Sequence, residues 1–313
     1  MYIAATIAPI CSMSVASQPM MKMESNFDFS SAEWLAVARA DAQRALHEDV
    51  GNGDLTDSLI ASDRGARARV LAREAALLCG APWVEAVVRE LDPAARIVWH
   101  VAEGARCAPE QTVLEISGSA RAMLTAERTA LNFLHLLSAV ATKTATYVDA
   151  VRGTRAQIVD TRKTLPGLRL AQKYAVRVGG GTNHRIGLHD AILIKENHIA
   201  AAGGVRAALH AAREVAARAS FVEIEVETLD QLDEALADGA RMVLLDNMDL
   251  ATLREAVRRN DAAGDARAVL EISGGVTLES VRALAETGVD RISVGALTKD
   301  VKAVDFSMRF QEA

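Results

Sequence analysis

The sequence predicts an α/β fold in which a small N-terminal α/β domain is followed by a β/α-barrel domain. Half of the 313 residues are hydrophobic and only 4% are aromatic, as expected for helices packed on a buried sheet. Beyond residue 157, short apolar runs alternate with helical segments, and successive β–α units imply parallel strands with right-handed crossovers. The preceding hundred residues mix helices with half-exposed strands, which is the pattern of a separate α+β domain.

Composition and charge exclude several classes of protein. The net charge of -6 and the pI near 5.7 argue against a nucleic-acid surface, which needs a broad basic face. Cys11, Cys79 and Cys107 show no CxxC spacing, so neither a disulfide framework nor a zinc site is indicated and a reducing cytoplasm is expected. We find no apolar run long enough to span a bilayer, so no membrane association is expected.

Residues 1–24 differ from the rest, being rich in Ser, Ala and Met. A secretory signal has a basic start and an apolar core, but the apolar part here is short and is broken by Pro9. We interpret this stretch as a disordered tail, or as the result of an upstream start codon with Met20, Met21 or Met23 as the natural beginning.

The N-terminal domain contains one helix followed by several short elements. Ser30 or Ser31 is a candidate cap for the first helix, and Glu33 places a favourable charge in its first turn. The segment EDVGNGDLTD that follows does not match the spacing of a calcium loop, so we expect a structured turn. The further elements expected are a strand over Arg67–Leu78, a helix over Pro82–Glu90, and strands over Ile97–His100 and Thr112–Ser117.

A long helix is predicted over Ala120–Val151, because Leu131, Leu134 and Leu137 follow helical spacing. Arg128 precedes the most apolar part of this helix. Its local sequence alone indicates an ordinary exposed arginine near the start of a helix.

The second domain is expected to gather functional side chains at one mouth of a closed or nearly closed barrel, where all strands end. The strands are expected at Gln157–Val159, Ala191–Ile194, Val222–Glu227, Met242–Leu245, Val269–Ile272 and Ile292–Val294. The helices between them are expected at Val205–Ala219, Leu229–Ala237, Leu250–Arg259 and Leu278–Glu286. The residues at the strand ends would be Arg162, Lys163, Lys195, Glu225, Asp246, Ser273 and Gly295.

The stretch from Asp160 to His198 is unusually rich in cationic donors. It contains Arg162, Lys163, His184, Arg185 and Lys195. Arginine matches carboxylate or phosphate oxygens bidentately and lysine acts as a point charge, so the cluster predicts a pocket for a multiply anionic small molecule. A solvated charged face is the alternative, but it fits less well because apolar strands precede two of these cations and few acids lie between them.

Glycines at the later strand ends indicate a phosphate site, and acids at neighbouring strand ends indicate a site for sugar hydroxyls or a metal ion. Ser273-Gly274-Gly275 and Gly295 each follow a strand, and glycines allow backbone N–H groups to approach an anion closely. Either glycine site alone could simply form a turn. Glu225 and Asp246 could accept sugar hydroxyls or hold Mg²⁺ directly or through water, although either could also be a structural acid.

Taken together, these segments resemble the quinolinate phosphoribosyltransferases, also called nicotinate-nucleotide pyrophosphorylases (carboxylating). The resemblance runs from Asp41 to about Phe306 and rests on EDVGNGDLT, AERTALNFL, DTRKTLPGLR, GGGTNHRIGLHDAILIKENHI, VEIEVET, LLDNM, EISGG and ISVGALT. It implies an α/β sandwich domain over residues 25–131 and 299–313, and an incomplete barrel of the type II phosphoribosyltransferase kind over residues 132–298. It also implies a homodimer with shared active sites, and leaves assembly beyond the dimer open.

The resemblance further implies an activity: quinolinate and 5-phosphoribosyl 1-pyrophosphate (PRPP) give nicotinate mononucleotide, pyrophosphate and carbon dioxide, with Mg²⁺. Lys163, Glu225 and Asp246 would be catalytic, and the last two would also hold the metal and the ribose. Quinolinate and pyrophosphate would be bound by Arg128 from the neighbouring subunit, Arg162, Lys163, His184, Arg185 and Lys195. The 5′-phosphate would lie against Ser273, Gly274 and Gly295.

Two other functions remain to be weighed. A sister transferase with another acceptor, such as nicotinate, would keep the phosphate glycines, but the full set of cations favours quinolinate. A non-catalytic binding or scaffold protein on this fold would be expected to have lost Lys163, Asp246 or a phosphate glycine, and all are present.

Overall fold

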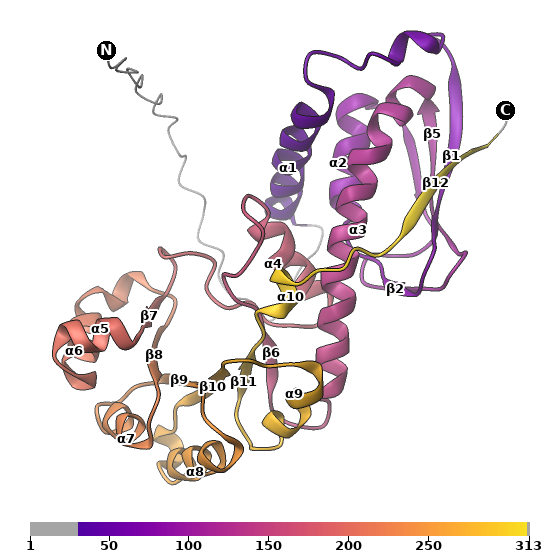
Figure 1. Ribbon diagram of the computed structural model, residues 1–313. Coiled ribbons are helices and arrows are strands. Elements are labelled where there is room, and N and C mark those ends of the chain that lie inside the picture. Colours follow the sequence, from indigo (N-terminus) through magenta and orange to yellow (C-terminus); the bar gives the residue numbers. More distant parts are fainter. Residues whose placement is uncertain (1–30, 312–313) are drawn as a thin grey trace, which may run out of the picture.

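The computed structural model describes residues 31–311, so the predicted tail over residues 1–24 and the candidate cap Ser30 lie outside it. The described chain forms an N-terminal region with an antiparallel sheet and a barrel region with a parallel sheet (Figure 1). None of its helices has the length and apolar character that crossing a membrane requires.

The N-terminal region is a four-stranded antiparallel sheet with three helices packed beside it (Figure 1). The strand order is β12-β1-β5-β3, with β1 at Gly65–Ala72, β3 at Arg96–Trp99, β5 at Thr112–Ser119 and β12 at Phe306–Gln311. The helices are α1 (Ala32–Val50), α2 (Ala81–Leu91) and the first half of α3 (Ala120–Ala150). The smaller elements are η1 (Asp57–Leu59), β2 (Ala76–Leu77) and β4 (Arg106–Cys107).

Two predictions for this region need correction. The single strand expected over Arg67–Leu78 is two strands, because Ala72 pairs with β12 whereas Ala76 pairs with Cys107 of β4. Ser31 occupies the cap position of α1, but its side chain makes no capping hydrogen bond. The expected turn after α1 is confirmed, and Asp54 organises it by accepting from both the backbone and the hydroxyl of Thr56.

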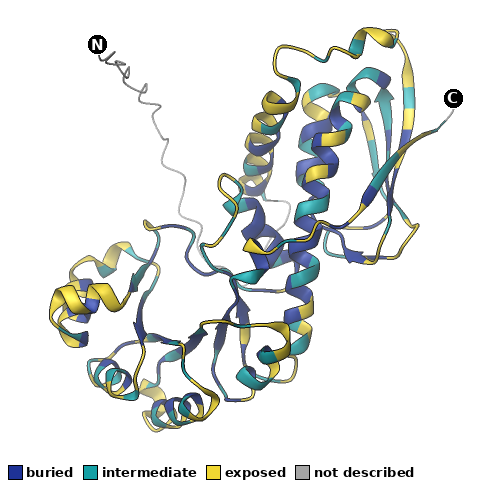
Figure 2. Cartoon of the chain, in the orientation of Figure 1, coloured by how far each residue is buried: buried dark blue, intermediate teal, exposed yellow. Residues whose placement is uncertain are grey.

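Helix α3 connects the two regions and ends within one residue of its predicted bound. Its predicted apolar face is confirmed, since Leu131, Leu134 and Leu137 are all buried, and Figure 2 shows much of the helix in the colour of buried residues. Its first half packs on β1 and β5, and the helix also contacts β6, α4 and α9 of the barrel region. The predicted domain boundary at 131/132 falls inside this continuous helix, and the division itself stays a prediction.

The barrel region is a curved sheet of six parallel strands covered on its outer side by helices (Figure 1). The strand order is β6-β11-β10-β9-β8-β7, with β6 at Gln157–Val159, β7 at Ile192–Ile194, β8 at Val222–Val226, β9 at Met242–Asp246, β10 at Val269–Ser273 and β11 at Arg291–Ser293. The helices are α4 (Arg169–Val178), α5 (Glu196–Ala202), α6 (Val205–Val215), α7 (Leu229–Ala237), α8 (Leu250–Asp261), α9 (Leu278–Ala285) and α10 (Ala296–Lys299), with short turns η2 (Ala216–Arg218) and η3 (Gly264–Ala266).

The sheet is open between β6 and β7, which confirms the expected incomplete barrel. The glycine-rich segment lies against the β6 edge, where Thr182 forms a parallel bridge with Val159. Two of the three glycines are required there by close approach to α3. A Cβ on Gly179 would lie 2.5 Å from the carbonyl oxygen of Ala141, and one on Gly181 would lie 2.8 Å from a methyl carbon of Thr144.

Candidate active site

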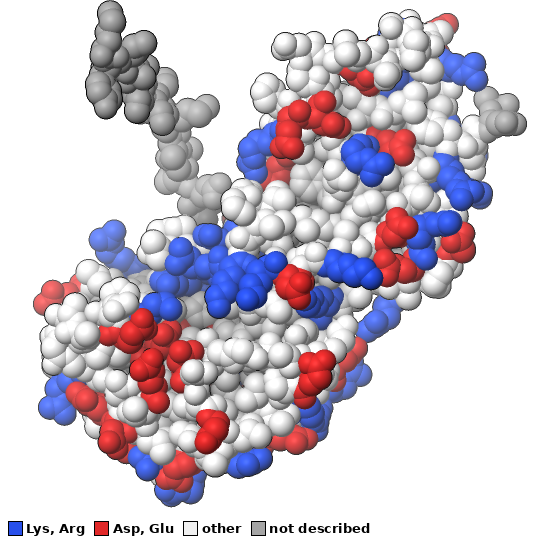
Figure 3. Space-filling view, in the orientation of Figure 1, with Lys and Arg blue, Asp and Glu red and all other residues white. Residues whose placement is uncertain are grey.

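The carboxyl ends of the parallel strands meet at one edge of the open barrel, facing the N-terminal region. Figure 3 shows a band of Lys and Arg side chains where the two regions meet, with a patch of Asp and Glu beside it on the barrel. Parallel pairing sets Ser273 opposite Asp246 at the ends of β10 and β9. The predicted gathering of strand ends at one mouth therefore follows directly from the register of the sheet.

Two carboxylates and a lysine lie together at the ends of β7, β8 and β9. Lys195 Nζ lies 3.4 Å from Oε2 of Glu225. The pKa of Glu225 is raised because the carboxylate is buried; Lys195 opposes this shift, and the negative charge of Asp246 adds to it. Two carboxylates that repel each other in this way form a site that a divalent cation would stabilise.

The glycines that follow β10 and β11 allow close contacts: Gly274 with the backbone of Asn247, and Gly295 with the side chain of Lys163. Gly274 has a φ of +101°, and a Cβ there would lie 3.3 Å from the backbone nitrogen of Asn247, itself at a φ of 56°. A Cβ on Gly295 would lie 3.0 Å from Cδ of Lys163 and 3.8 Å from its Nζ. The exposed ammonium group of Lys163 is thus held beside the glycine turn that precedes α10.

Two arginines, Arg162 and Arg185, lie close enough for their positive charges to repel each other. Nε of Arg162 is buried and has no hydrogen-bond partner among the described residues. The guanidinium of Arg185 is also buried and donates to the carbonyl oxygen of Ala191 at 3.3 Å. Burial lowers the pKa of Arg185, and the positive charge of Arg162 lowers it further. Two neighbouring guanidinium groups, one of them with a buried and unused donor, are chemically suited to bind an anion.

The ring of His184, a residue predicted to line the basic pocket, is held by two hydrogen bonds within the protein. Its Nδ1 accepts the backbone N–H of Arg185 at 2.8 Å, and its Nε2 lies 2.7 Å from Oε2 of Glu223. Burial lowers the pKa of this imidazole, so the neutral form is favoured. Both ring nitrogens are already bonded within the protein, which leaves none for a carboxylate of a bound molecule.

Below His184, a buried layer of charged side chains crosses the inside of the barrel. Arg291 Nε lies 2.9 Å from Oε2 of Glu271 in an ion pair that lacks hydrogen-bond geometry, and Ser293 donates its hydroxyl to Oε1 of Glu271. Burial raises the pKa of Glu223 to about 7 and that of Glu271 to about 7, the second also through repulsion by Glu223. Local sequence patterns did not predict this layer, because its members come from separate strands.

One nitrogen and two carboxylates of this layer have the residue types of a metal site, and their ligand atoms lie within 4.8 Å of one another (His184, Glu223 and Glu271). The geometry of His184 argues against that use. Nδ1 already accepts an N–H, so a neutral ring must carry its proton on Nε2, and that nitrogen then has no lone pair to offer a metal. We therefore interpret these residues as a hydrogen-bonded network.

A buried ion pair fixes the backbone that carries His184. Lys173 donates to Oδ1 of Asp160 and, at 2.9 Å, to the carbonyl oxygen of His184, while the N–H of His184 donates to Asp160 at 2.8 Å. Asn183 donates to the second carboxylate oxygen of Asp160 at 2.6 Å. Asp160 directly follows β6, a signal available in the sequence, but its partner Lys173 could not be found from spacing.

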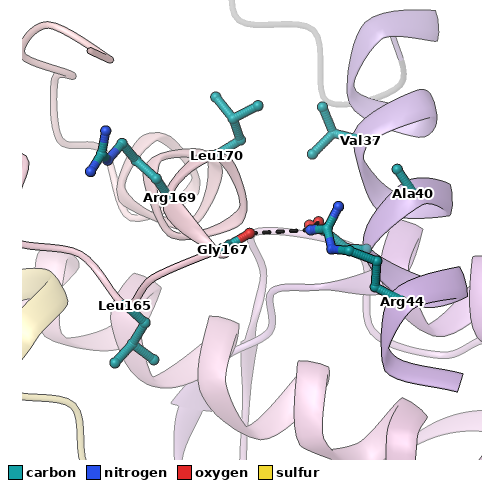
Figure 4. A pocket seen from close by; sticks show the side chains of 8 residues that line it. Val37, Ala40, Arg44, Leu165, Gly167, Arg169 and Leu170 are labelled. Carbon is teal, nitrogen blue, oxygen red and sulfur yellow. Dashed lines mark hydrogen bonds and ion pairs between the residues drawn. The ribbon is translucent and has the colours of Figure 1, made fainter. Parts of the chain in front are cut away.

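The loop that follows β6 is held from its far side by the N-terminal region. A hollow there is lined by Val37, Ala40, Asp41, Arg44, Leu165, Gly167, Arg169 and Leu170 (Figure 4). Arg44 donates across it to the carbonyl oxygen of Gly167 at 3.2 Å, the dashed line in Figure 4. Arg169 donates to Thr164 and Ile186, both at 3.1 Å. These contacts make the hollow part of the support for the loop.

Arg128 is exposed on α3, and its side chain makes no hydrogen bond or ion pair with another described residue. The structure therefore brings together most of the predicted site within one chain: the arginine pair, the Lys163–Gly295 contact, the Lys195–Glu225 pair and the Asp246–Ser273 register. Arg128 stands outside this group.

Comparison with known proteins agrees with this geometry along nearly the whole described chain. Residues 54–138 match the family model of the quinolinate phosphoribosyl transferase N-terminal domain, and residues 140–309 match that of its C-terminal domain. The two models meet within α3.

Individual relatives and solved structures are similar over most of their length. A nicotinate-nucleotide pyrophosphorylase [carboxylating] of Mycobacterium leprae is 45% identical over 276 residues, covering 87% of this chain and 96% of the relative. A probable enzyme of the same name from Bacillus subtilis is 41% identical, covering 83% and 89%. The structure of the nicotinate-nucleotide pyrophosphorylase from Francisella tularensis superposes with a TM-score of 0.83 at 42% identity, covering 88% of this chain and 97% of that one.

Proposed function

The chain belongs to the quinolinate phosphoribosyltransferase family, and from this premise we propose how its own residues carry out the family reaction. The protein is a pentosyltransferase of de novo NAD biosynthesis. It converts quinolinate and PRPP to nicotinate mononucleotide, pyrophosphate and carbon dioxide. The observation that carries the assignment of the acceptor site is the arginine pair, Arg162 and Arg185, with the buried, unpaired Nε of Arg162.

Quinolinate binds between these two guanidinium groups, with Lys195 at the edge of the same site. Its two carboxylates add negative charge beside the pair, on which Asp190 and Glu223 already act within the protein. The carboxylate that remains in the product must be held firmly, and a bidentate arginine contact does so. The other carboxylate is lost as carbon dioxide.

PRPP binds with its 5′-phosphate against the backbone of Ser273, Gly274 and Gly295. The two glycines carry no side chain that would keep a phosphate from their backbone N–H groups. The contact between Lys163 and Gly295 supports a role for this lysine in binding phosphate oxygens of PRPP. Glu225 and Asp246 lie at neighbouring strand ends beside the ribose, and their carboxylates accept hydrogen bonds from its hydroxyl groups.

Chemistry in this site is mainly positioning and electrostatics. Departure of pyrophosphate leaves positive charge on the sugar, which the carboxylates of Glu225 and Asp246 stabilise, while Lys163 offsets the charge of the leaving group. The pyridine nitrogen of quinolinate then forms the bond to the sugar carbon. The positively charged ring accepts the electron pair left when the adjacent carboxylate departs as carbon dioxide, and a proton replaces it.

A Mg²⁺ ion fits the pair Glu225 and Asp246, because burial and then repulsion by Asp246 raise the pKa of Glu225, and a cation would relieve that repulsion. Bound there, directly or through water, it would supply charge to offset the pyrophosphate. The neighbouring Lys195, whose ammonium group lies 3.4 Å from Glu225, would be freed to contact the acceptor.

We also propose a homodimer in which Arg128 of one subunit reaches the acceptor site of the other. Arg128 lies one helical turn after Leu124, which is 43% exposed, and near them Leu55 and Leu59 are 95% and 79% exposed. The link between these segments is the hydrogen bond from Thr125 to Asp54, at 2.9 Å. Exposed leucines beside an unpaired arginine support burial against a second copy. We place the enzyme in the cytoplasm, as its cysteine usage favours.

The decisive experiment is an assay with purified protein, PRPP and Mg²⁺, with either quinolinate or nicotinate as acceptor. We expect nicotinate mononucleotide and carbon dioxide from quinolinate. The value of kcat/KM for nicotinate should be far lower, because one carboxylate leaves cations of the site unpaired. Comparable values for both acids would favour the sister transferase, and no product from either would favour a non-catalytic protein.

A further inference from the structure

The segment that presents Arg185 is held by contacts that converge on its neighbour, His184. The N–H and the carbonyl oxygen of His184 are bonded to Asp160 and Lys173, at 2.8 and 2.9 Å. Its ring lies edge-on to Phe221, with the centroids 5.3 Å apart and an angle of 81°. The remaining freedom of the side chain is the choice of which ring nitrogen carries the proton.

The hydrogen bonds of the ring determine that choice. The backbone N–H of Arg185 can only donate, so Nδ1 must present a lone pair to it at 2.8 Å. In the neutral ring the proton is then on Nε2, which donates to Oε2 of Glu223 at 2.7 Å. Glu223 lies on β8, is fully buried and accepts the hydrogen bond that the Nε2–H of His184 donates.

From this arrangement we propose that Glu223 is a positioning residue for the acceptor site. By accepting from Nε2 of His184 it fixes the tautomer whose Nδ1 holds the N–H of Arg185, and so it fixes the direction in which the Arg185 guanidinium enters the quinolinate site. His184 transmits this constraint. The inference rests on the acceptor site proposed above.

Charge supports the same role. Glu223 lies close enough to Arg185 and Arg291 for both to act on its ionisation, and its Oε1 has no hydrogen-bond partner among the described residues. Glu271, in the same layer, provides a natural comparison. It is equally buried, but it is bonded to Ser293 and paired with Arg291, and its nearest oxygen lies 3.6 Å from Nε2 of His184.

The test compares Glu223→Leu, Glu223→Gln and the control Glu271→Gln. Leucine cannot accept a hydrogen bond from Nε2 of His184. KM and Kd for quinolinate should therefore rise about tenfold or more, while KM and Kd for PRPP change less than about twofold. Glutamine keeps an acceptor oxygen and should restore quinolinate binding to within about threefold of the native value. The control should leave the ratio of the two KM values unchanged.

Several outcomes would overturn the proposal. Equal losses for both substrates would indicate a merely structural residue, and failure of glutamine to rescue would indicate that charge, not the hydrogen bond, matters. The same selective loss in Glu271→Gln would assign the effect to the layer as a whole.

A second measurement covers the case in which Glu223→Leu fails to fold. In native protein with ¹⁵N-labelled histidine, His184 should show an unprotonated Nδ1 and a protonated Nε2, assigned by comparison with His184→Asn. A proton on Nδ1 would contradict the proposal. This measurement needs no substrate, so it remains informative if the native protein fails to bind quinolinate, which would instead refute the proposed acceptor site.

Discussion

The N-terminal region contains an antiparallel sheet of four strands, whereas the barrel region contains a parallel sheet of six. Antiparallel strands end alternately at opposite edges, so the residues after them are scattered. Parallel strands all end at the same edge, so one residue from each β–α unit reaches the same mouth. This difference explains why the candidate site lies on the barrel although both regions are built from sheets and helices.

The two regions also differ in their buried charges. The barrel region buries Asp160, Lys173, His184, Arg185, Glu223, Glu225, Glu271 and Arg291. In the N-terminal region, Asp41 accepts from the indole of Trp83 at 2.9 Å and also pairs with the exposed Arg44. Glu103, whose pKa is raised by burial, caps the start of α2 by accepting from Gly80 and Ala81. Buried acids thus support packing in one region and arrange cations in the other.

The largest expected effect separates these two uses of a buried aspartate. Asp160→Ala would leave the ammonium of Lys173 buried and unpaired, which should cost about 3–5 kcal/mol in the free energy of unfolding. Asp41→Ala is the matched control, because it strands only the neutral N–H of Trp83, at a cost of about 1–3 kcal/mol. Denaturant unfolding of both variants measures the difference, and equal losses would contradict the distinction.

The second prediction tests whether the N-terminal region contributes to the chemistry at all. Arg128→Ala should fold and dimerise but lose about 2–5 kcal/mol of transition-state stabilisation, because a contact to a buried carboxylate is removed. Mixing it with inactive Lys163→Ala under subunit exchange should restore activity, since one of the two sites in each mixed dimer is intact. Mixed dimers that form but stay inactive would refute a shared site.

The third prediction compares a glycine from each region. Gly295→Val should weaken PRPP binding about tenfold or more, because its side chain displaces Lys163 and obstructs the backbone approach to phosphate. Gly65→Val is the control, since a Cβ there meets only the carbonyl oxygen of Gly118 at 3.8 Å. Calorimetry gives both Kd values, and an unchanged value for Gly295→Val would place the phosphate elsewhere.

The fourth prediction concerns pH. Burial raises the folded-state pKa of Glu271 to about 7 from its ordinary value of 4.5, so its protonated form favours folding. That stabilisation is complete below the unfolded-state pKa and is lost as pH rises through the folded-state pKa. Between these values native protein should lose up to about 1.4 kcal/mol per pH unit relative to Glu271→Gln. Parallel stability curves for the two proteins would contradict the raised pKa.

The smallest effects should come from two non-glycine residues with positive φ. Glu110 has a φ of 63° in the N-terminal region, and Asn247 has a φ of 56° beside Gly274. Glu110→Gly should stabilise the protein by at most about 1 kcal/mol without changing activity, because relief of the left-handed backbone is partly offset by loss of the exposed ion pair with Arg73. Asn247→Gly should change stability less, because asparagine tolerates this conformation. Thermal unfolding and kcat/KM measure both, and a larger gain at Asn247 would contradict this order.

Much of the fold could be predicted because its signals are local. The order of β–α units, the bounds of α3 and the residues that follow each strand are visible in apolar periodicity and turn residues. Short elements such as β4 and α10 were not anticipated, because two to four residues carry too little periodicity. The division of Arg67–Leu78 into two strands also depends on partners far along the chain, β12 and β4.

The sequence by itself determined which residue types reach the mouth of the barrel: Arg162, Lys163 and Lys195 with Glu225, Asp246 and the glycines. The tertiary structure alone decided which buried side chains are paired and how their pKa values are shifted. It lowered the pKa of His184 by burial, held its ring with two hydrogen bonds, and paired Asp160 with Lys173. It also assembled the layer of Glu223, Glu271 and Arg291. The physical reason is that the charge of a side chain depends on its solvation and on neighbours brought close by folding, and neither is encoded in local spacing.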